Sequence, residues 1–263
     1  MIRSALLPLF LLSASCCVHP NVSHQQKQKE NPVLKMMNSV VLINVTIAVT
    51  NLEQPSDMSG GDLVEVPGEV KWSGSGVVYK NFSASNGDKH SLILTANHVL
   101  ETPAIGSIED IEVEFLGMKI NQGKRRIESV LITATTENGQ ICLLEPLRMG
   151  DNELADVATG EVYCEAGSAA VIATSNPVKG EKVFVVGHPQ GIKNTIVTEG
   201  YVSGTDEDGF LVLSAPAWGG NSGGPVFHDG KVIGLLVRGS RAYHHITMVT
   251  PLEELWKRIF ATN

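Results

Sequence analysis

Basic residues are scarce in this sequence and are nowhere clustered. Lysine and arginine together number 20 against 28 aspartates and glutamates, which gives a net charge of −8 with histidine neutral. The longest basic run is Lys124-Arg125-Arg126. Because a nucleic-acid-binding surface needs concentrated positive charge, this balance argues against DNA or RNA as a partner.

Long apolar runs are lacking as well. The stretch from Ala5 to Val18 holds only about 14 residues, short of the roughly 20 that span a bilayer. With Arg3 before it and small residues near its end, it is typical of an export signal, expected over residues 1–17. It resembles a bacterial lipoprotein signal, which implies lipidation at Cys16; simple cleavage is the open alternative. We therefore expect an exported protein, periplasmic or membrane-anchored through that lipid, alternatively secreted.

The few cysteines have no metal-binding spacing. Of the four, Cys16 and Cys17 belong to the signal, whereas Cys142 and Cys164 lie in separate strand-like segments. These two can pair in an oxidising compartment or remain buried free thiols, and both alternatives stay open. We expect neither a metal nor a cofactor.

Aromatic residues make up only 5% of the chain, whereas glycine is frequent, at 26 residues. From Ser39 onward, short apolar runs alternate with turn-forming residues, which predicts an all-β barrel or sandwich. Only Pro251–Phe260 has helical periodicity, and the polar residues 18–35 are expected to form a flexible tether. The expected strands cover residues 40–43, 76–79, 91–95, 111–115, 130–134, 141–144, 182–186, 196–203, 210–214 and 232–237.

The most informative segment is Trp218-Gly219-Gly220-Asn221-Ser222-Gly223-Gly224-Pro225-Val226. Its glycines leave little bulk around the Ser222 hydroxyl and permit backbone angles that turn consecutive N–H groups toward one point. The N–H groups of Gly220 and Ser222 would then form an oxyanion hole. Taken alone, such a segment can also be a plain glycine-rich turn, but the β run that follows makes it more specific.

Asn221-Ser222-Gly223-Gly224-Pro225 resembles the nucleophile loop of the trypsin-like superfamily, in its bacterial HtrA/Deg branch. Leu92–Leu100 is similar to the catalytic histidine segment of that family, and Gly74–Val78 to the strand before it. Further matches at 186–191, 199–204 and 230–234 follow in the family's order, so the resemblance covers roughly residues 38–260. It implies two six-stranded antiparallel β-barrels, over 36–165 and 166–263, with the active site between them.

The resemblance implies Ser222 as nucleophile and His98 as general base. An imidazole titrates near neutral pH, so it can take the serine proton and return it to the leaving amine. Asp156, in Ala155-Asp156-Val157-Ala158, is similar to the family's acid, which orients the imidazole and stabilises its cation. Asp151 and Asp110 are the weaker candidates for this role. The remaining histidines lack the motif around His98 and are expected to be non-catalytic: His90, His188, His228, His244 and His245.

Two departures from known branches carry information. Asn221 stands where the digestive branch has an aspartate that pairs with a freshly cut N-terminus. An amide has no charge to offer an ammonium group, so we expect no zymogen activation of that kind. The HtrA branch usually has a PDZ domain after the protease, and here the expected terminal helix ends the sequence, so no PDZ domain is expected.

The substrate pocket is expected to have its floor just before Ser222 and its wall in the strand ending at Gly239. No carboxylate stands at Pro216, six positions before the nucleophile, so a tryptic Lys/Arg preference is not expected. The candidate lining residues are Pro216, Ala217, Val237, Arg238, Gly239 and His244. Arg238 and His244 can favour an acidic residue, as in the glutamyl endopeptidases, or lie at the surface beside a small apolar pocket.

The sequence therefore predicts a serine endopeptidase that acts on proteins or peptides through an acyl-enzyme. A catalytically silent relative, serving as a binding or chaperone module, is the alternative from another class. An α/β-hydrolase esterase also fits the bare Gly-x-Ser-x-Gly pattern. In that fold the acid and histidine follow the serine, whereas here His98 and Asp156 precede it.

Overall fold

The computed structural model describes residues 31–53, 64–115, 118–149, 156–239, 246–251 and 253–256. These residues belong to one compact unit that starts at Asn31. The expected signal with Cys16, the weaker acid candidate Asp151 and the pocket candidate His244 lie outside the described residues.

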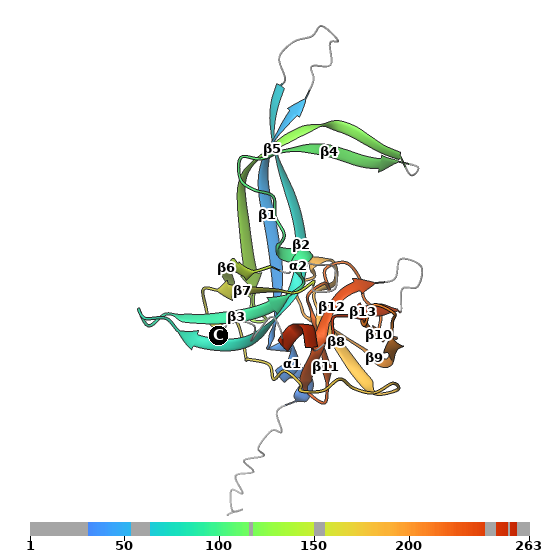
Figure 1. The fold of residues 1–263 in the computed structure, drawn as a ribbon. Helices are drawn as coiled ribbons and strands as arrows, with labels where there is room; N and C mark the ends of the chain where they lie inside the picture. The colour runs from blue at the N-terminus through green and yellow to red at the C-terminus, as the bar shows by residue number, and fades with distance from the viewer. Residues whose placement is uncertain are drawn as a thin grey trace, which may run out of the picture. The chain divides into compact units, whose positions relative to one another are not determined.

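The first sheet has seven strands in the order β1-β2-β3-β7-β6-β5-β4 (Figure 1). An additional pairing of β1 with β5 joins six of them into a ring, and β4 is appended to β5. All pairings are antiparallel. The strands are β1 (Val40–Glu53), β2 (Val64–Ser83), β3 (Lys89–Thr95), β4 (Ile108–Phe115), β5 (Met118–Thr135), β6 (Ile141–Arg148) and β7 (Ala158–Val162).

The second sheet is a closed barrel in the order β10-β13-β12-β11-β8-β9. Four of its six strands have only three to six residues, as expected from a sequence in which turn-forming residues separate short apolar runs. They are β8 (Lys182–Gly187), β9 (Ile196–Thr205), β10 (Leu211–Leu213), β11 (Pro225–His228), β12 (Lys231–Gly239) and β13 (Thr247–Val249). The all-β prediction is therefore confirmed; β4, which covers the strand expected over 111–115, is a seventh strand beside the six of the ring.

Strand β1 links the apolar cores of the two barrels. Val41, Ile43 and Val45 are fully buried in the core of the first barrel, whereas Val40 belongs to the core of the second. Beyond Ile43 the strand alternates buried and partly exposed residues, as a strand covered on one face must. Each fully buried valine or isoleucine contributes about 1.5–3 kcal/mol, so β1 contributes to both barrels at once.

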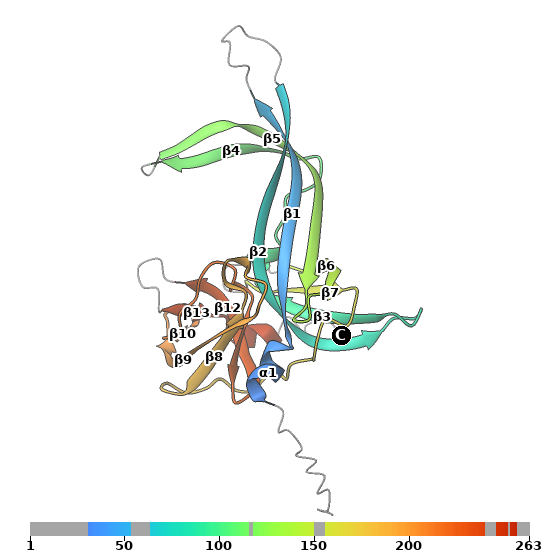
Figure 2. The ribbon, with the colours of Figure 1, turned by 180° about the vertical axis from the view of Figure 1, so that it is seen from behind.

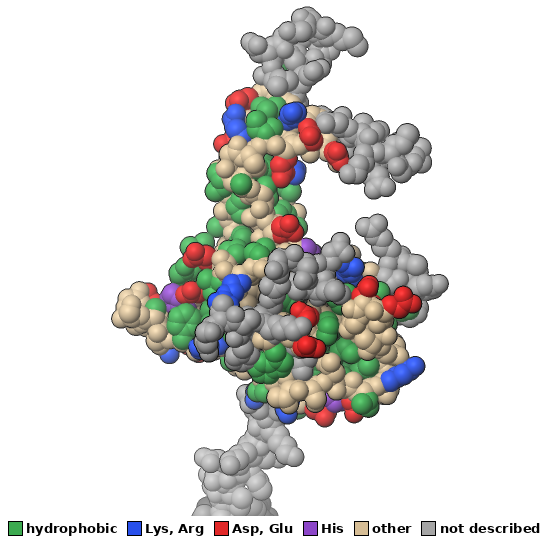
Figure 3. All heavy atoms as spheres, viewed as in Figure 1, with side chains coloured by type: hydrophobic (Ala, Val, Ile, Leu, Met, Phe, Trp, Pro, Cys, Tyr) green, Lys and Arg blue, Asp and Glu red, His purple; other side chains and the backbone are tan. Residues whose placement is uncertain are grey.

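The ends of β1, β2 and β5 extend beyond the first barrel as a three-stranded stem (Figure 1). Hydrophobic side chains cover much of the visible face of this stem, and charged ones gather at its far end (Figure 3). There Arg126 contacts Glu65 at 3.2 Å and Glu128 at 2.9 Å. Ion pairs this exposed to solvent stabilise a protein only weakly, so the long β1–β2 ladder is the main support of the stem.

Helices are few. Helix α1 (Pro32–Met37) overlaps the end of the tether expected over 18–35 and lies next to β8 (Figure 2). It forms there because the Asn31 side chain accepts a hydrogen bond from Val33 N at 3.0 Å and because Met36 is buried in the second core. Residues 253–256 are helical, which confirms a small C-terminal helix within the expected Pro251–Phe260. No helix in the described part of the chain is long and apolar enough to cross a membrane.

The structure pairs Cys142 of β6 with Cys164, which follows β7, and so decides between the two alternatives left by the sequence. The disulfide closes a loop with a sequence separation of 22 residues. Both sulfur-bearing side chains are buried in the first core. The bond ties the end of the first sheet to the segment that leads into the second.

We expect the Cys142→Ser/Cys164→Ser double variant to lose about 3 kcal/mol of unfolding free energy, because it restores the conformational freedom of that loop in the unfolded chain. Urea denaturation of the variant and the oxidised parent measures the difference. A parent whose unfolding midpoint is the same with and without reductant would contradict a stabilising disulfide.

Candidate active site

His98 lies where the first barrel turns from strand to helix. Strand β3 ends at the buried Thr95, and the chain enters the short helix α2 (Asn97–Leu100). Val99 and Leu100 on this helix are buried, which holds the turn against the core. The His98 side chain points the other way and is 45% exposed, so it is available to a reactant.

Asp156 holds His98 at two points. Its Oδ1 accepts a hydrogen bond from the His98 backbone N–H at 3.0 Å, and its Oδ2 lies 2.7 Å from Nδ1 of the imidazole. The buried Val157 follows Asp156 and leads into β7, which pairs with β3. A carboxylate at Nδ1 places the imidazole proton there and leaves the Nε2 lone pair free to act as a base.

The electrostatics of Asp156 favour its ionised form. Burial of this carboxyl acts to raise its pKa, but the hydrogen bonds and the charge interaction with His98 outweigh burial and leave the pKa below its ordinary value. Asp110, the weaker candidate, lies on β4 with Lys124 Nζ at 4.0 Å and a half-exposed side chain. Of the two candidate acids that the structure describes, only Asp156 contacts the imidazole.

The loop between β10 and β11 carries Ser222 and packs directly against the end of β3. Gly223 has a φ of +78°, and a Cβ there would lie 2.1 Å from Thr95 Oγ1 and 2.6 Å from Ala96 N. Only glycine fits so close an approach. The structure therefore brings the Ser222 loop to the residues that lead into His98. Within the described residues it gives no hydrogen bond between the Ser222 hydroxyl and the imidazole, a bond that often forms only when substrate is bound.

Ser75, a fully buried residue of β2, connects three parts of this region. Its hydroxyl donates to Gly220 O at 2.8 Å and accepts from His188 N at 2.9 Å. Its backbone N–H donates to Ser222 O at 2.8 Å, and its carbonyl accepts from Thr95 Oγ1 at 2.7 Å. One residue of the first barrel thus fixes the Ser222 loop of the second and the end of the strand that precedes His98.

Sequence reasoning did not single out Ser75. It lies in Gly74–Val78, which was interpreted only as a strand, and the flanking pattern gives no sign that its hydroxyl turns toward the other barrel. Its only visible signal was a polar residue within an apolar strand that reads Gly-Ser-Gly-Val-Val. Such a residue must find hydrogen-bond partners if it is buried.

The backbone N–H groups of Gly220 and Ser222 are unused. In the described part of the chain neither has a hydrogen-bond acceptor, although Gly220 is buried and Ser222 partly so. Buried N–H groups without an acceptor are rare in proteins. An oxyanion of a bound reactant is a group that they can bind.

The residues expected to line a substrate pocket are only partly brought together. Pro216 and Ala217 are partly buried, and Thr198 Oγ1 donates to Pro216 O at 3.0 Å. Val237 is buried, and the exposed Arg238 places its guanidinium 5.8 Å from the ring centre of Phe210. Gly239 is exposed at the end of β12. The sequence did not indicate Thr198 or Phe210, which come from the neighbouring β9 and the turn before β10.

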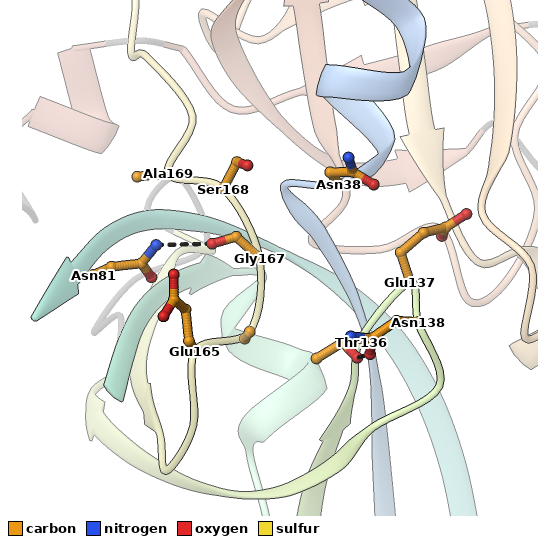
Figure 4. Close-up of a pocket in the computed structure, with 10 residues that line it drawn as sticks. Asn38, Asn81, Thr136, Glu137, Asn138, Glu165, Gly167, Ser168 and Ala169 are labelled. Carbon is orange, nitrogen blue, oxygen red and sulfur yellow. Dashed lines mark hydrogen bonds between the residues drawn. The ribbon is translucent and has the colours of Figure 1, made fainter. Parts of the chain in front are cut away.

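A polar pocket of about 730 Å³ lies elsewhere, between Asn38, the β5–β6 turn and residues 165–169 (Figure 4). Some of its polar groups bond to one another: Asn81 Nδ2 donates to Gly167 O at 2.8 Å, and Thr136 Oγ1 donates to Asn138 Oδ1. None of the candidate site residues lines it. Its volume alone does not make this pocket an active site.

His188, just after β8, is a buried histidine next to the candidate active site. Its side chain is almost fully buried, and its Nδ1 lies 3.0 Å from Ile192 O, so Nδ1–H donates to that carbonyl. Nε2 has no partner in the described residues. Burial lowers the pKa of His188 below its ordinary 6.5, while the bond to Ile192 and the charge of Glu137 act in the opposite direction. Folding therefore favours the neutral form of this imidazole.

We expect Ser75→Ala to lower the unfolding free energy by about 2–4 kcal/mol, because Gly220 O and His188 N then lose their buried partner. Ser91→Ala is the matched control, since Ser91 is equally buried and its hydroxyl accepts from Ala166 N at 2.8 Å, away from Ser222. Urea unfolding compares the stabilities, and labelling by a fluorophosphonate compares the reactivity of Ser222. Both variants lose stability, but only Ser75→Ala loses reactivity; equal labelling rates would contradict the role assigned to Ser75.

The neutral His188 makes stability depend on pH. Between its lowered folded pKa and 6.5 the unfolded chain binds a proton that the folded protein does not, so the unfolding free energy falls as pH falls through this window. The slope is at most about 1.4 kcal/mol per pH unit. Urea denaturation from pH 7.5 to 5 should show a smaller slope for His188→Asn. His228→Asn controls for the loss of a surface imidazole bonded to a carbonyl; an unchanged slope in His188→Asn would contradict this account.

Known proteins share both the sequence pattern and the fold. The sequence model of the trypsin-like peptidase domain family matches residues 74–235, which contain His98, Asp156 and Ser222. A mitochondrial protein of Arabidopsis thaliana, described as protease Do-like 12, is 34% identical over 87 residues, which are 29% of this chain and 17% of that protein. This chain therefore matches only a small part of that relative's length.

The crystal structure of the serine endoprotease from Yersinia pestis superposes on the chain with a TM-score of 0.54 and 21% identity. The superposition covers 87% of this chain and 64% of that one. At this identity the likeness establishes the fold, and it confirms the trypsin-like architecture expected from the sequence. Because the family match covers more than half of the sequence, the chain belongs to the trypsin-like peptidase domain family, with the fold of an HtrA-like protease.

Proposed function

We propose that this protein is a serine endopeptidase that hydrolyses peptide bonds through an acyl-enzyme at Ser222. The observation that carries the proposal is the two-point hydrogen bonding of His98 by Asp156, beside a loop that packs Gly223, the neighbour of Ser222, against the end of β3. A structural histidine does not need an ionised carboxylate at Nδ1 and an exposed Nε2. Both are what a general base needs.

The chemistry follows from these positions. His98 Nε2 takes the proton of the Ser222 hydroxyl as Oγ attacks the substrate carbonyl, and Asp156 stabilises the imidazolium that results. The N–H groups of Gly220 and Ser222 bind the oxyanion of the tetrahedral intermediate. His98 then gives its proton to the leaving amine, and a water molecule, activated by the same base, hydrolyses the acyl-enzyme.

Two features favour a substrate with a small apolar side chain at the peptide bond that is cleaved. Pro216, Ala217 and Val237 are apolar, and no carboxylate stands at Pro216 to bind a basic residue. Arg238 lies near the Phe210 ring at cation–π distance, which occupies one face of its guanidinium. This arrangement favours the apolar pocket over a preference for acidic residues.

Activation by a new N-terminus is not part of the proposal. Asn221 is buried, and its Oδ1 lies 2.9 Å from the position of a Cβ on Gly187. An uncharged amide in this tight place offers no counter-ion to an ammonium group. The loop must therefore be held by other hydrogen bonds, of which those from Ser75 of β2 are the most central.

The Cys142–Cys164 disulfide supports export. Disulfides persist in the periplasm and outside the cell and are rare in the reducing cytosol. The proposed location is therefore the periplasm or the cell exterior, with attachment to a membrane through Cys16 and simple cleavage of the signal as the two alternatives.

Labelling by a fluorophosphonate probe, together with cleavage of denatured casein, tests the proposal on four forms of the chain without the signal. Wild type should be labelled and should cleave, and Ser222→Ala should do neither. Asp156→Asn should lose about 10³- to 10⁴-fold in kcat, because the imidazole then adopts the wrong tautomer. Asp110→Asn is the matched control and should behave as wild type. Mass spectrometry of the casein fragments reads the residue preference.

The alternative is a protease-like binding or chaperone module. That function predicts that wild type and Ser222→Ala suppress casein aggregation equally well, with no labelling of either. A folded wild-type protein that neither labels nor cleaves would refute the peptidase proposal.

A further inference from the structure

A hydrogen bond to its carbonyl fixes the orientation of the peptide bond between Gly219 and Gly220. The backbone N–H of Gln190 donates to Gly219 O at 2.6 Å. In a trans peptide the carbonyl and the N–H point in opposite directions, and the described residues contain no cis peptide. The N–H of Gly220 therefore points away from Gln190, and in the described part of the chain it has no acceptor.

The next peptide bond is held as well. Gly220 O accepts from Ser75 Oγ at 2.8 Å, so both carbonyls that flank the Gly220 N–H have a donor. Gly220 itself has a φ of +92°, and a Cβ there would lie 2.5 Å from His188 O and 2.7 Å from Gln190 N. Rotating the Gly219–Gly220 peptide would break the Gln190 bond and turn a carbonyl, rather than an N–H, toward the reactant.

The donor to Gly219 O has an unusual backbone. Gln190 lies in the short helix η2 (Pro189–Gly191) with φ 54° and ψ 25°, in the left-handed region that residues other than glycine rarely adopt. Asp229 is the other described non-glycine residue with a positive φ, at 49°. Strained backbone of this kind persists only where its surroundings impose it, and it is often found at functional sites.

The surroundings that impose it are the ends of the 188–192 turn, defined as His188 to Ile192. His188 N donates to Ser75 Oγ, and the His188 imidazole donates to Ile192 O at 3.0 Å, which joins the two ends. Gly191 N donates to His188 O at 3.0 Å. The charged group that faces this imidazole is Glu137, from the β5–β6 turn, whose carboxylate accepts from Thr195 Oγ1.

We infer that the 188–192 turn sets the oxyanion hole, with Gln190 as a positioning residue that acts through the Gly219 carbonyl. The inference rests on the proposed function, because it concerns the oxyanion donor of that same site. Gln190 contributes through its backbone, so its side chain matters only by allowing or opposing the left-handed conformation. Glycine adopts this conformation freely, alanine with difficulty and a β-branched residue hardly at all.

This dependence gives a graded test. In the chain without the signal, the fluorophosphonate labelling rate of Ser222 should stay within about threefold of wild type for Gln190→Gly and fall about 10- to 100-fold for Gln190→Val, with Gln190→Ala between them. The phosphoryl oxygen of the probe must enter the oxyanion hole, and loss of one donor there costs about 10²–10³ in rate. For casein cleavage the loss should appear in kcat and leave KM nearly unchanged.

Asp229→Val is the matched control, since it places the same β-branched residue at the other left-handed position, in the turn between β11 and β12. It should lower the thermal unfolding temperature as much as Gln190→Val does and leave labelling unchanged. The low-field proton resonance of His98 Nδ1–H should persist in every variant, which shows that the His98–Asp156 pair is intact.

The outcomes separate this inference from the proposed function. If wild type labels and the three Gln190 variants label at the same rate, the positioning role is overturned and the peptidase proposal stands. If Gln190→Val fails to fold, the ratio of Gln190→Ala to Gln190→Gly decides in the same way. If wild type itself does not label, the proposed function fails and this inference fails with it.

Discussion

The buried hydroxyl of Ser75 is the interaction on which the candidate site most depends. It comes from β2 of the first barrel, yet its partners are Gly220 O and His188 N of the second. Two β-barrels that merely pack together can slide, because apolar contacts have no direction. Hydrogen bonds have direction, and in a buried place a lost bond leaves an uncompensated polar group. Ser75 therefore fixes the position of the part of the chain that carries His98 relative to the part that carries Ser222.

Each barrel supplies one part of the candidate site. The first supplies the His98–Asp156 pair, whose two hydrogen bonds orient the imidazole and keep the carboxyl ionised. The second supplies the Ser222 loop, whose glycines allow it to approach the end of β3. Neither barrel holds a complete site. At Gly223 a side chain would collide with Thr95 and Ala96 of the first barrel, so only glycine allows this close approach.

How far sequence reasoning reaches can be judged from particular residues. The all-β fold and the motifs around His98 and Ser222 were accessible because apolar alternation and glycine-rich turns are local patterns. The strands β7 and β13 were missed, since Ala158–Val162 and Thr247–Val249 are short and become strands only by pairing with neighbours far away in the sequence. Helix α1 was missed because six residues are too few to show a helical period. Ser75 and Gln190 act through backbone groups of distant residues, and no local pattern contains that information.

The most direct test of this account is a crystal structure of the fluorophosphonate adduct of Ser222. The account predicts that the phosphoryl oxygen lies about 2.7–3.1 Å from the backbone nitrogens of both Gly220 and Ser222. It also predicts that Gly219 O remains bonded to Gln190 N and Gly220 O to Ser75 Oγ, as in the free protein. A phosphoryl oxygen bound outside these two N–H groups, or an adduct in which the Gly219–Gly220 peptide has rotated, would contradict it.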